Sequence, residues 1–147
     1  MTYSECVTMG IKHFFGRVDV MDPLFEAPPL VAAPVKAGLY SCCVWRSKTE
    51  KKGNLYSTIE KIGIYLNGKI PEANSMKKLG EITVKGLAGF FINKPNVSID
   101  VLRNSDACVG KDGFLGASGY GSGEYPVYCF LQGDEIIALE IIFFKED

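Results

Sequence analysis

The segment of this 147-residue chain whose composition most suggests chemistry is GFLGASGYGSGEY, at positions 113–125. Five glycines fall between Gly113 and Gly123. Because a glycine-rich backbone can bring several amide groups close to an anion, one interpretation is a binding loop. The segment has no Lys-Ser or Lys-Thr ending, and it leads into a strand pattern instead of a helix, unlike a phosphate loop. The other interpretation is a tight, irregular connection that uses positive φ angles.

Tyr120 would give this segment a role in recognition. An exposed tyrosine offers a large amphipathic contact, and such residues are enriched at binding surfaces. Glycines lose much conformational entropy on folding, and loops held on a rigid sheet commonly carry function. The alternative is that Tyr120 folds back to close the sheet. The candidate binding residues are therefore Asp22, Gly119, Tyr120, Gly121, Gly123 and Glu124.

Side chains for catalysis are few. His13 is the single histidine, and Ser-His-Asp, Cys-His and multi-histidine metal sites would all need it. No G-x-S-x-G or H-E-x-x-H motif is present, so a partly buried, structural histidine is the alternative that we favour. Two carboxylates in one cleft could perform acid-base catalysis on a sugar, but the sequence does not pair them. The separable carboxylates are Asp19, Asp22, Glu60, Asp100, Asp112 and Glu124. We predict no catalytic residue.

The cysteines indicate free thiols and no metal. The chain has five of them, an odd number without C-x-x-C spacing. Cys42 and Cys43 are adjacent and would point to opposite faces of a strand, so they do not form a shared ligand pair. We expect reduced thiols, no bound metal and no cofactor, in agreement with a cytoplasmic location. The five are Cys6, Cys42, Cys43, Cys108 and Cys129.

Charge and hydropathy exclude two kinds of partner. The chain has 16 basic and 17 acidic residues and a formal net charge of -1, which is unlike a general nucleic-acid binder. The densest basic cluster, at positions 48–52, contains Glu50 and is typical of a solvated loop. The longest apolar run, IIALEIIFF, has Glu140 in its middle and about half the roughly 18 residues needed to span a bilayer. The first residues do not resemble a signal peptide, so we expect a cytoplasmic protein that does not enter membranes.

The elements that position these residues are predicted to be strands. Aromatic residues number 17 and glycines 16, and β-branched residues are frequent, which favours strands separated by turns. We expect a single all-β domain over residues 1–147, either a two-sheet sandwich or a strongly curved, partly closed barrel, with at most one or two short helices. The alternative is an α+β fold with helix in 69–85 or 105–113. The predicted strands are 18–21, 39–46, 56–66, 81–85, 87–92, 97–103, 125–131 and 135–144.

The most clearly marked element is the C-terminal hairpin. Gln132-Gly133-Asp134 joins two strand patterns with a three-residue loop, and the last strand has almost no polar face. We expect this strand to be central, with Ile137, Leu139, Ile141 and Phe143 on one core face. Glu140 falls on the other face with Ile136, Ala138 and Ile142, and we expect it to be paired or at the wet end of the strand.

Three connections also have expected forms. Asn67-Gly68 is typical of a type I′ turn, but the following Ile70-Pro71 prevents a long return strand. The four prolines of DPLFEAPPLVAAP, at positions 22–34, exclude regular helix and predict an extended lid over a sheet edge. A short helix is possible at 74–79.

These features together resemble a family of small bacterial and phage-associated proteins classified as a domain of unknown function. The family pattern has an early Asp-Pro, a glycine before a tyrosine-bearing strand, and an S-G-x-G-x-G-x-Y loop. The family often has aspartate where this chain has Ser122, and the resemblance implies a fold more than an activity. The matching residues are Asp22, Pro23, Gly38, Tyr40, Ser118, Gly119, Gly121, Gly123 and Tyr125.

For function, two classes follow. The first is a cytosolic protein without catalysis that binds another protein, such as an immunity-like or phage-borne inhibitor. The second is a small carboxylate-dependent enzyme acting on a sugar or nucleotide. The shortage of histidine, metal ligands and nucleophile motifs favours the first class.

Overall fold

The structure is a computed structural model that describes residues 2–24, 27–93, 106–118 and 121–143. These described residues are nearly all strand, as the composition predicts, and contain one short 3-10 helix. The elements are β1 (Thr2–Met21), β2 (Leu30–Lys51), β3 (Asn54–Leu66), η1 (Ala73–Ser75), β4 (Met76–Val84), β5 (Leu87–Phe91), β6 (Ala107–Val109), β7 (Gly113–Ala117), β8 (Gly123–Gln132) and β9 (Glu135–Ile142).

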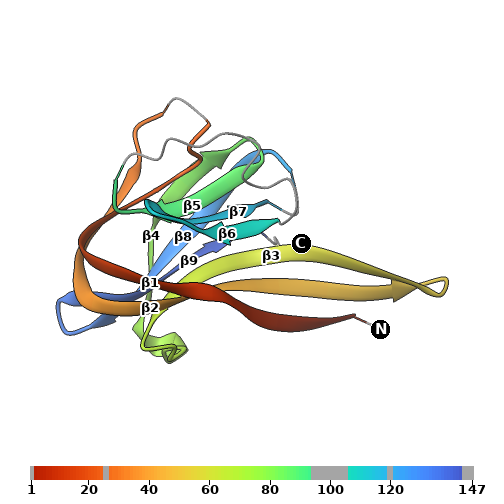
Figure 1. The fold of residues 1–147 in the computed structure, drawn as a ribbon, viewed down its shortest axis with the longest axis horizontal. Coiled ribbons are helices and arrows are strands. Elements are labelled where there is room, and N and C mark those ends of the chain that lie inside the picture. The colour runs from red at the N-terminus through yellow and green to blue at the C-terminus, as the bar shows by residue number, and fades with distance from the viewer. Residues whose placement is uncertain (1, 25–26, 94–105, 119–120, 144–147) are drawn as a thin grey trace.

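All of these strands belong to one sheet, in the order β4-β8-β9-β3-β2-β1-β5-β7-β6 (Figure 1). Neighbouring strands are antiparallel, and β2 makes an additional parallel pairing with β9 at Val35 and Ile136. Within the described residues the two end strands, β4 and β6, do not pair with each other, so the sheet is curved but not closed into a barrel. The all-β expectation is confirmed, and the α+β alternative is wrong.

Strands β1 and β2 are long because both bend. Residues 2–14 of β1 pair with the second half of β2, whereas residues 19–21 pair with β5. Three register shifts interrupt the β1–β2 ladder, and Gly16 has a φ of 67°, in the left-handed region. Such bulges bend and twist a strand. Both strands bend at the left of Figure 1, and β5, β6 and β7 lie above β1, β2 and β3 in this view.

Beyond this bend, β1, β2 and β3 continue as a three-stranded arm that extends well past the rest of the molecule (Figure 1). The β2–β3 turn at its tip uses positive φ angles at Lys52 and Gly53. In the described part of the chain, β9 pairs with β3 only at residues 61–65. The outer half of β3 is therefore an edge of the sheet and pairs only with β2. The basic cluster at 48–52 therefore lies at the tip of the arm, with Lys51 and Lys52 exposed.

The main core lies inside the curved sheet and is rich in aromatic rings. Phe14 and Tyr40 meet edge to face with centroids 5.7 Å apart, and Tyr125 and Phe143 do so at 5.2 Å. Both geometries are favourable for aromatic pairs. The sheet is close-packed around these rings: Gly10 of β1 lies against the Val109 side chain of β6, where a Cβ would be 2.9 Å from Val109 Cγ2.

The C-terminal hairpin is confirmed, with two corrections. Strands β8 and β9 pair, and β9 lies between β8 and β3. The loop has two residues, Gly133 and Asp134, and not three, because Gln132 pairs with Glu135. Leu139 and Ile141 are fully buried in the main core, but Ile136 and not Ile137 joins them there. The physical reason is a register shift in the β8–β9 ladder near Leu131, which reverses the side-chain alternation at the start of β9.

Other predicted elements differ in extent. The segment expected to be a lid becomes strand from Leu30 onward, and the first half of β1 is strand although its pattern did not indicate one. The proposed helix at 74–79 is a 3-10 turn followed directly by β4. The type I′ turn is confirmed, with φ of 56° at Asn67 and 70° at Gly68. The predicted strand 97–103 lies outside the described residues.

Candidate functional site

Asp22 is the first of the predicted binding residues, and the structure buries it. Its side chain is at the end of β1, and the residue is 3% exposed. One carboxylate oxygen accepts a hydrogen bond from the backbone N–H of Leu24 at 2.8 Å, and the other accepts one from the N–H of Lys85 at 2.7 Å. The first bond is the Asx turn typical of aspartate before proline. The second fastens the end of β1 to the β4–β5 turn.

The glycine-rich loop reaches the same turn. Ser118 donates its backbone N–H to the carbonyl of Gly86 at 2.8 Å, next to the Lys85 that binds Asp22. Gly121 has a φ of 76°, and its carbonyl accepts hydrogen bonds from the hydroxyls of Ser118 and Tyr125, both at 2.9 Å. The loop therefore has the positive φ and internal bonding of a tight connection.

Of the four remaining candidate residues, two lie in β8 and two lie outside the described residues. Gly123 and Glu124 begin β8, where Glu124 is exposed and pairs in register with Thr83 of β4. Gly119 and Tyr120 lie outside the described residues, so the proposed display of the Tyr120 ring stays a prediction. Asp22 and the described part of the loop thus lie at one end of the sheet, joined through residues 85–86.

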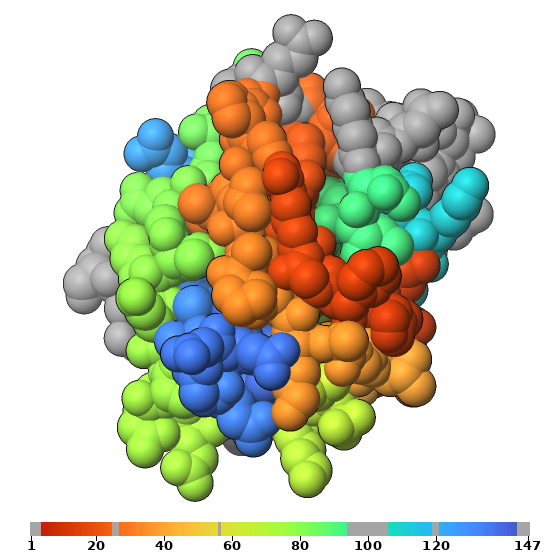
Figure 2. All heavy atoms as spheres, turned by 90° about the vertical axis from the view of Figure 1, so that its left-hand side faces the viewer, coloured from red at the N-terminus to blue at the C-terminus, as the bar shows by residue number. Residues whose placement is uncertain are grey.

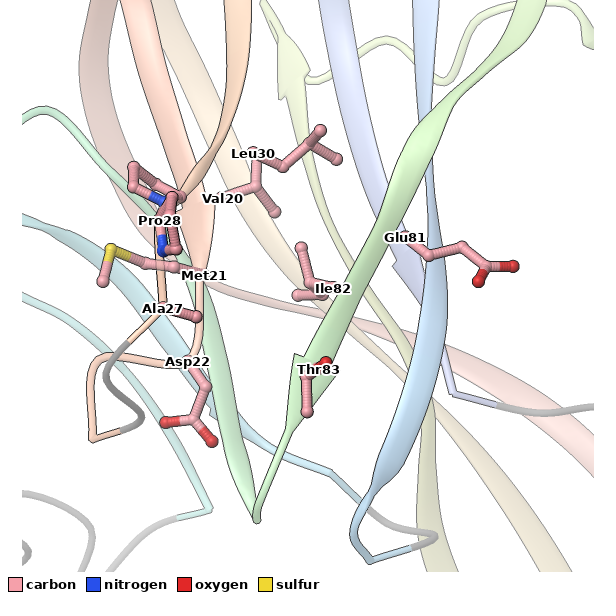
Figure 3. A pocket seen from close by; sticks show the side chains of 10 residues that line it. Val20, Met21, Asp22, Ala27, Pro28, Leu30, Glu81, Ile82 and Thr83 are labelled. Atoms are coloured by element: carbon pink, nitrogen blue, oxygen red, sulfur yellow. The ribbon is translucent and has the colours of Figure 1, made fainter.

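A small pocket of about 200 Å³ opens beside Asp22, between the end of β1, the start of β2 and β4 (Figure 3). Its wall combines polar and apolar surface, with Val20, Leu30 and Ile82 among the apolar residues. Glu81 also borders the pocket, but Figure 3 shows its carboxylate on the far side of β4, where it pairs with Lys78 at 3.0 Å. The two carboxylates do not converge, so this pocket lacks the paired acids of a glycosidase.

A second cluster of chemical groups surrounds Glu140, on the outer face of the sheet. Glu140 is 3% exposed, and its Oε2 accepts a hydrogen bond from the Tyr65 hydroxyl at 2.5 Å and lies 3.2 Å from Lys61 Nζ. Trp45 Nε1 donates to the Tyr65 oxygen at 2.8 Å, and the Lys61 ammonium lies 4.4 Å from the centroid of the Trp45 ring. The buried carboxylate therefore has both a cation and a hydrogen-bond donor, as burial of a charge requires.

Gly63 makes this arrangement possible. It pairs directly with Glu140 across β3 and β9, and a Cβ there would collide with the hydroxyl and ring of Tyr65. The Tyr65 ring consequently lies across Gly63 and reaches the carboxylate. Of the two alternatives for Glu140, pairing is confirmed, but no sequence pattern indicated that its partner would be a tyrosine two residues beyond a glycine.

The electrostatics of this face keep the Tyr65 hydroxyl and the Cys6 thiol protonated. Burial, together with the charge of Glu140, raises the pKa of the Tyr65 hydroxyl, which therefore acts as a donor. Cys6 is exposed, but partial desolvation of its thiol raises the pKa to about 11, and the neighbouring Cys43 adds to the effect. Because the thiolate is the reactive form of cysteine, Cys6 is a weak nucleophile at neutral pH. The cluster holds strands together and does not present an activated nucleophile.

The residues that mark the family resemblance also have structural contacts. A Cβ on Gly38 would lie 2.5 Å from Leu66 Cδ1, so its missing side chain makes room for Leu66. Tyr40 is fully buried and donates its hydroxyl to the carbonyl of Lys36 at 2.6 Å. Burial raises the pKa of Tyr40 to about 12, with a further contribution from Glu135. These residues support the fold more directly than a reaction.

The exposed part of the bend carries a patch that the sequence reasoning missed. Ile11, His13 and Phe15 alternate along β1 and face outward, and Leu39 of β2 lies opposite His13 in the ladder. Ile11, Phe15 and Leu39 are 63%, 56% and 57% exposed, and the rings of His13 and Phe15 lie 5.5 Å apart. We call these four residues the corner patch. His13, predicted to be partly buried, is exposed instead.

Groups that could hold a metal are not found in the ranges that the structure describes, where no three His, Cys, Asp or Glu side chains come together. All five cysteines are free thiols. In the same ranges, no helix has the length and apolar character needed to cross a membrane.

Comparisons with protein-family models, with curated proteins and with solved structures return no match for this chain. The likeness to a family of unknown function is therefore carried only by the residues that suggested it.

Proposed function

We propose that this protein acts without catalysis by binding another protein, in the manner of an immunity-like or phage-borne inhibitor, in the cytosol. The observation that carries the proposal is the corner patch. Large apolar side chains scattered singly on a surface are ordinary, but a contiguous group of them marks an interaction site. Free thiols in all five cysteines support the cytosolic location.

The form of the patch also supports a protein partner. Its four side chains project from two paired strands and not from a flexible loop, so little conformational entropy is lost when a partner covers them. Figure 2 faces the bend, where β1 (red) and β2 (orange) cross an outer surface of the molecule. A partner could reach this surface without any movement of the sheet.

The enzyme alternative has weaker support. Within the described ranges, the two buried carboxylates are Asp22 and Glu140, and both are occupied by structural partners. Asp19, another candidate acid, pairs with Arg17 at 2.9 Å. These acids stabilise the fold where they lie and do not face a common cleft.

Site-specific photo-crosslinking tests the proposal. A benzophenone amino acid placed at Phe15 or at Leu39 in the native host should join the chain to one protein of different sequence. The same probe at Leu55, an equally exposed apolar position on the arm, is the matched control and should not do so.

Three results would contradict the proposal. The first is the same crosslinking pattern from Leu55 as from the corner patch, and the second is no crosslinked product from the patch. The third is a product of twice the chain's mass, identified as two copies of the chain, because that would make the patch a self-association surface.

A further inference from the structure

A larger hollow, of about 600 Å³, lies where the middle of β2, the β3–β4 connection and the β8–β9 turn meet. Its volume falls within the roughly 300–1,000 Å³ typical of small-molecule sites. Figure 2 shows this end of the molecule, with the β8–β9 hairpin (blue) beside β2 (orange) and the segment after β3 (light green). We call this hollow the lysine groove, after Lys36 and Lys69, which line it.

Apolar side chains form part of the lining of the lysine groove, beside polar ones. Leu66, Leu131 and Ile137 line it and are only partly buried, and Ile70 at its margin is 56% exposed. The missing side chain of Gly38 creates the space into which Leu66 packs. Apolar side chains that line a concave surface and remain open to water favour a ligand with an apolar body.

The walls of the groove are fixed before any ligand arrives. The turn after β3 is closed by a hydrogen bond from the Lys69 N–H to the Leu66 carbonyl at 3.2 Å. The Asn67 N–H donates to the carbonyl of Leu39 in β2 at 2.8 Å. On the other wall, Ser75 donates its hydroxyl to the carbonyl of Glu72 at 2.8 Å. A preformed groove avoids the entropy loss of ordering loops on binding.

The charge of the groove is positive. Two cationic side chains, Lys36 and Lys69, line the groove, and its lining contains one carboxylate, that of the exposed Glu72. Lys36 Nζ donates to Gln132 Oε1 at 3.1 Å, which holds the ammonium beside the β8–β9 turn. Five other cations have carboxylate partners, but in the part of the chain described, neither Lys36 nor Lys69 has one.

From the apolar part of the lining, the fixed walls and the two ammonium groups, we propose that the lysine groove binds a small organic anion. The ligand consists of an apolar body that covers Leu66 and Leu131 and one carboxylate or phosphate that lies between Lys36 and Lys69. This site shares no lining residue with the corner patch and goes beyond the proposed protein binding. It requires no chemical step.

The test uses two probes with the same apolar body, 1-naphthoate and the neutral 1-naphthalenemethanol, titrated by calorimetry. We expect the full-length protein to bind 1-naphthoate at least about fivefold more tightly than the neutral alcohol, because an exposed ion pair contributes roughly this much to affinity. The double variant Lys36→Ala, Lys69→Ala should bind both probes equally. The matched control Lys51→Ala, Lys52→Ala, at the tip of the arm, should keep the preference.

The proposal is overturned if neither probe binds, if the native chain shows no preference for the anion, or if the double variant retains that preference. Both lysine side chains reach water, so the double variant should have the same melting temperature as the native protein when unfolding is followed by circular dichroism. It should also leave crosslinking from Phe15 unchanged, so failure of the groove and failure of the corner patch give different results.

Discussion

Removing the Tyr65 hydroxyl should destabilise the protein much more than loss of one oxygen atom usually does. This hydroxyl is the donor to Glu140 at 2.5 Å and the acceptor for Trp45 Nε1 at 2.8 Å. In Tyr65→Phe, the ring still covers Gly63, so the apolar packing is kept. The change isolates the polar contacts of a side chain that is 1% exposed.

The magnitude follows from what the substitution leaves behind. A hydrogen bond to a charged group contributes about 1.5–3 kcal/mol, and an unsatisfied buried donor costs about 1–3 kcal/mol. Glu140 keeps its ion pair with Lys61, and Trp45 is half-buried, so water can partly replace its partner. We therefore expect Tyr65→Phe to lower the free energy of unfolding by about 2–4 kcal/mol.

Urea denaturation at neutral pH, followed by Trp45 fluorescence and circular dichroism, measures this change. The matched control is Tyr128→Phe, because Tyr128 lies directly opposite Glu140 on β8, is half-buried and makes no side-chain hydrogen bond to the described residues. It should cost under about 0.5 kcal/mol. Equal losses in the two variants, or a loss below about 1 kcal/mol for Tyr65→Phe, would refute the role given to this hydroxyl.

Three other predictions concern stability. Gly89→Ala should cost more than about 3 kcal/mol in urea denaturation, because its Cβ would collide with the Phe114 carbonyl; Gly110→Ala, in open space, should cost under about 1 kcal/mol. Asp22→Ala should lower the free energy of unfolding by about 2–4 kcal/mol, because it leaves two backbone N–H groups without an acceptor. A loss equal to that of Asp134→Ala, at an exposed position, would contradict this. Burial raises the pKa of Cys42 from 9.0 to about 12, so the folded state holds its proton while the unfolded state loses it. Stability should fall as the pH rises from about 9 to about 12, and less steeply in Cys42→Ala; identical slopes would show that this thiol is not responsible.

The strand class and several turns could be predicted because their causes are local. Alternation of apolar residues marks a strand with one buried face, as in β3, and a glycine within a short loop marks the β8–β9 hairpin. Asn67-Gly68 adopts the positive φ angles that its type favours. In each case neighbouring residues suffice to set the backbone.

The long strands could not be predicted because their continuity depends on partners far away in the sequence. The first half of β1 has no clear alternation, but β2 pairs with it over most of its length. The prolines before β2 indicated an irregular lid, whereas pairing with β1 turns the segment from Leu30 onward into strand. A single bulge near Leu131 then exchanged the faces of Ile136 and Ile137.

For the candidate sites, the sequence determined residue types and the tertiary structure decided their roles. Composition alone indicated a β-rich chain with few catalytic groups, because side-chain chemistry and strand propensity are properties of each residue. Whether Asp22 binds a ligand or two backbone amides, and whether His13 is buried or exposed, depends on which strands meet. The corner patch and the lysine groove join residues from separate strands and turns, and their exposure is fixed only when the sheet bends and packs.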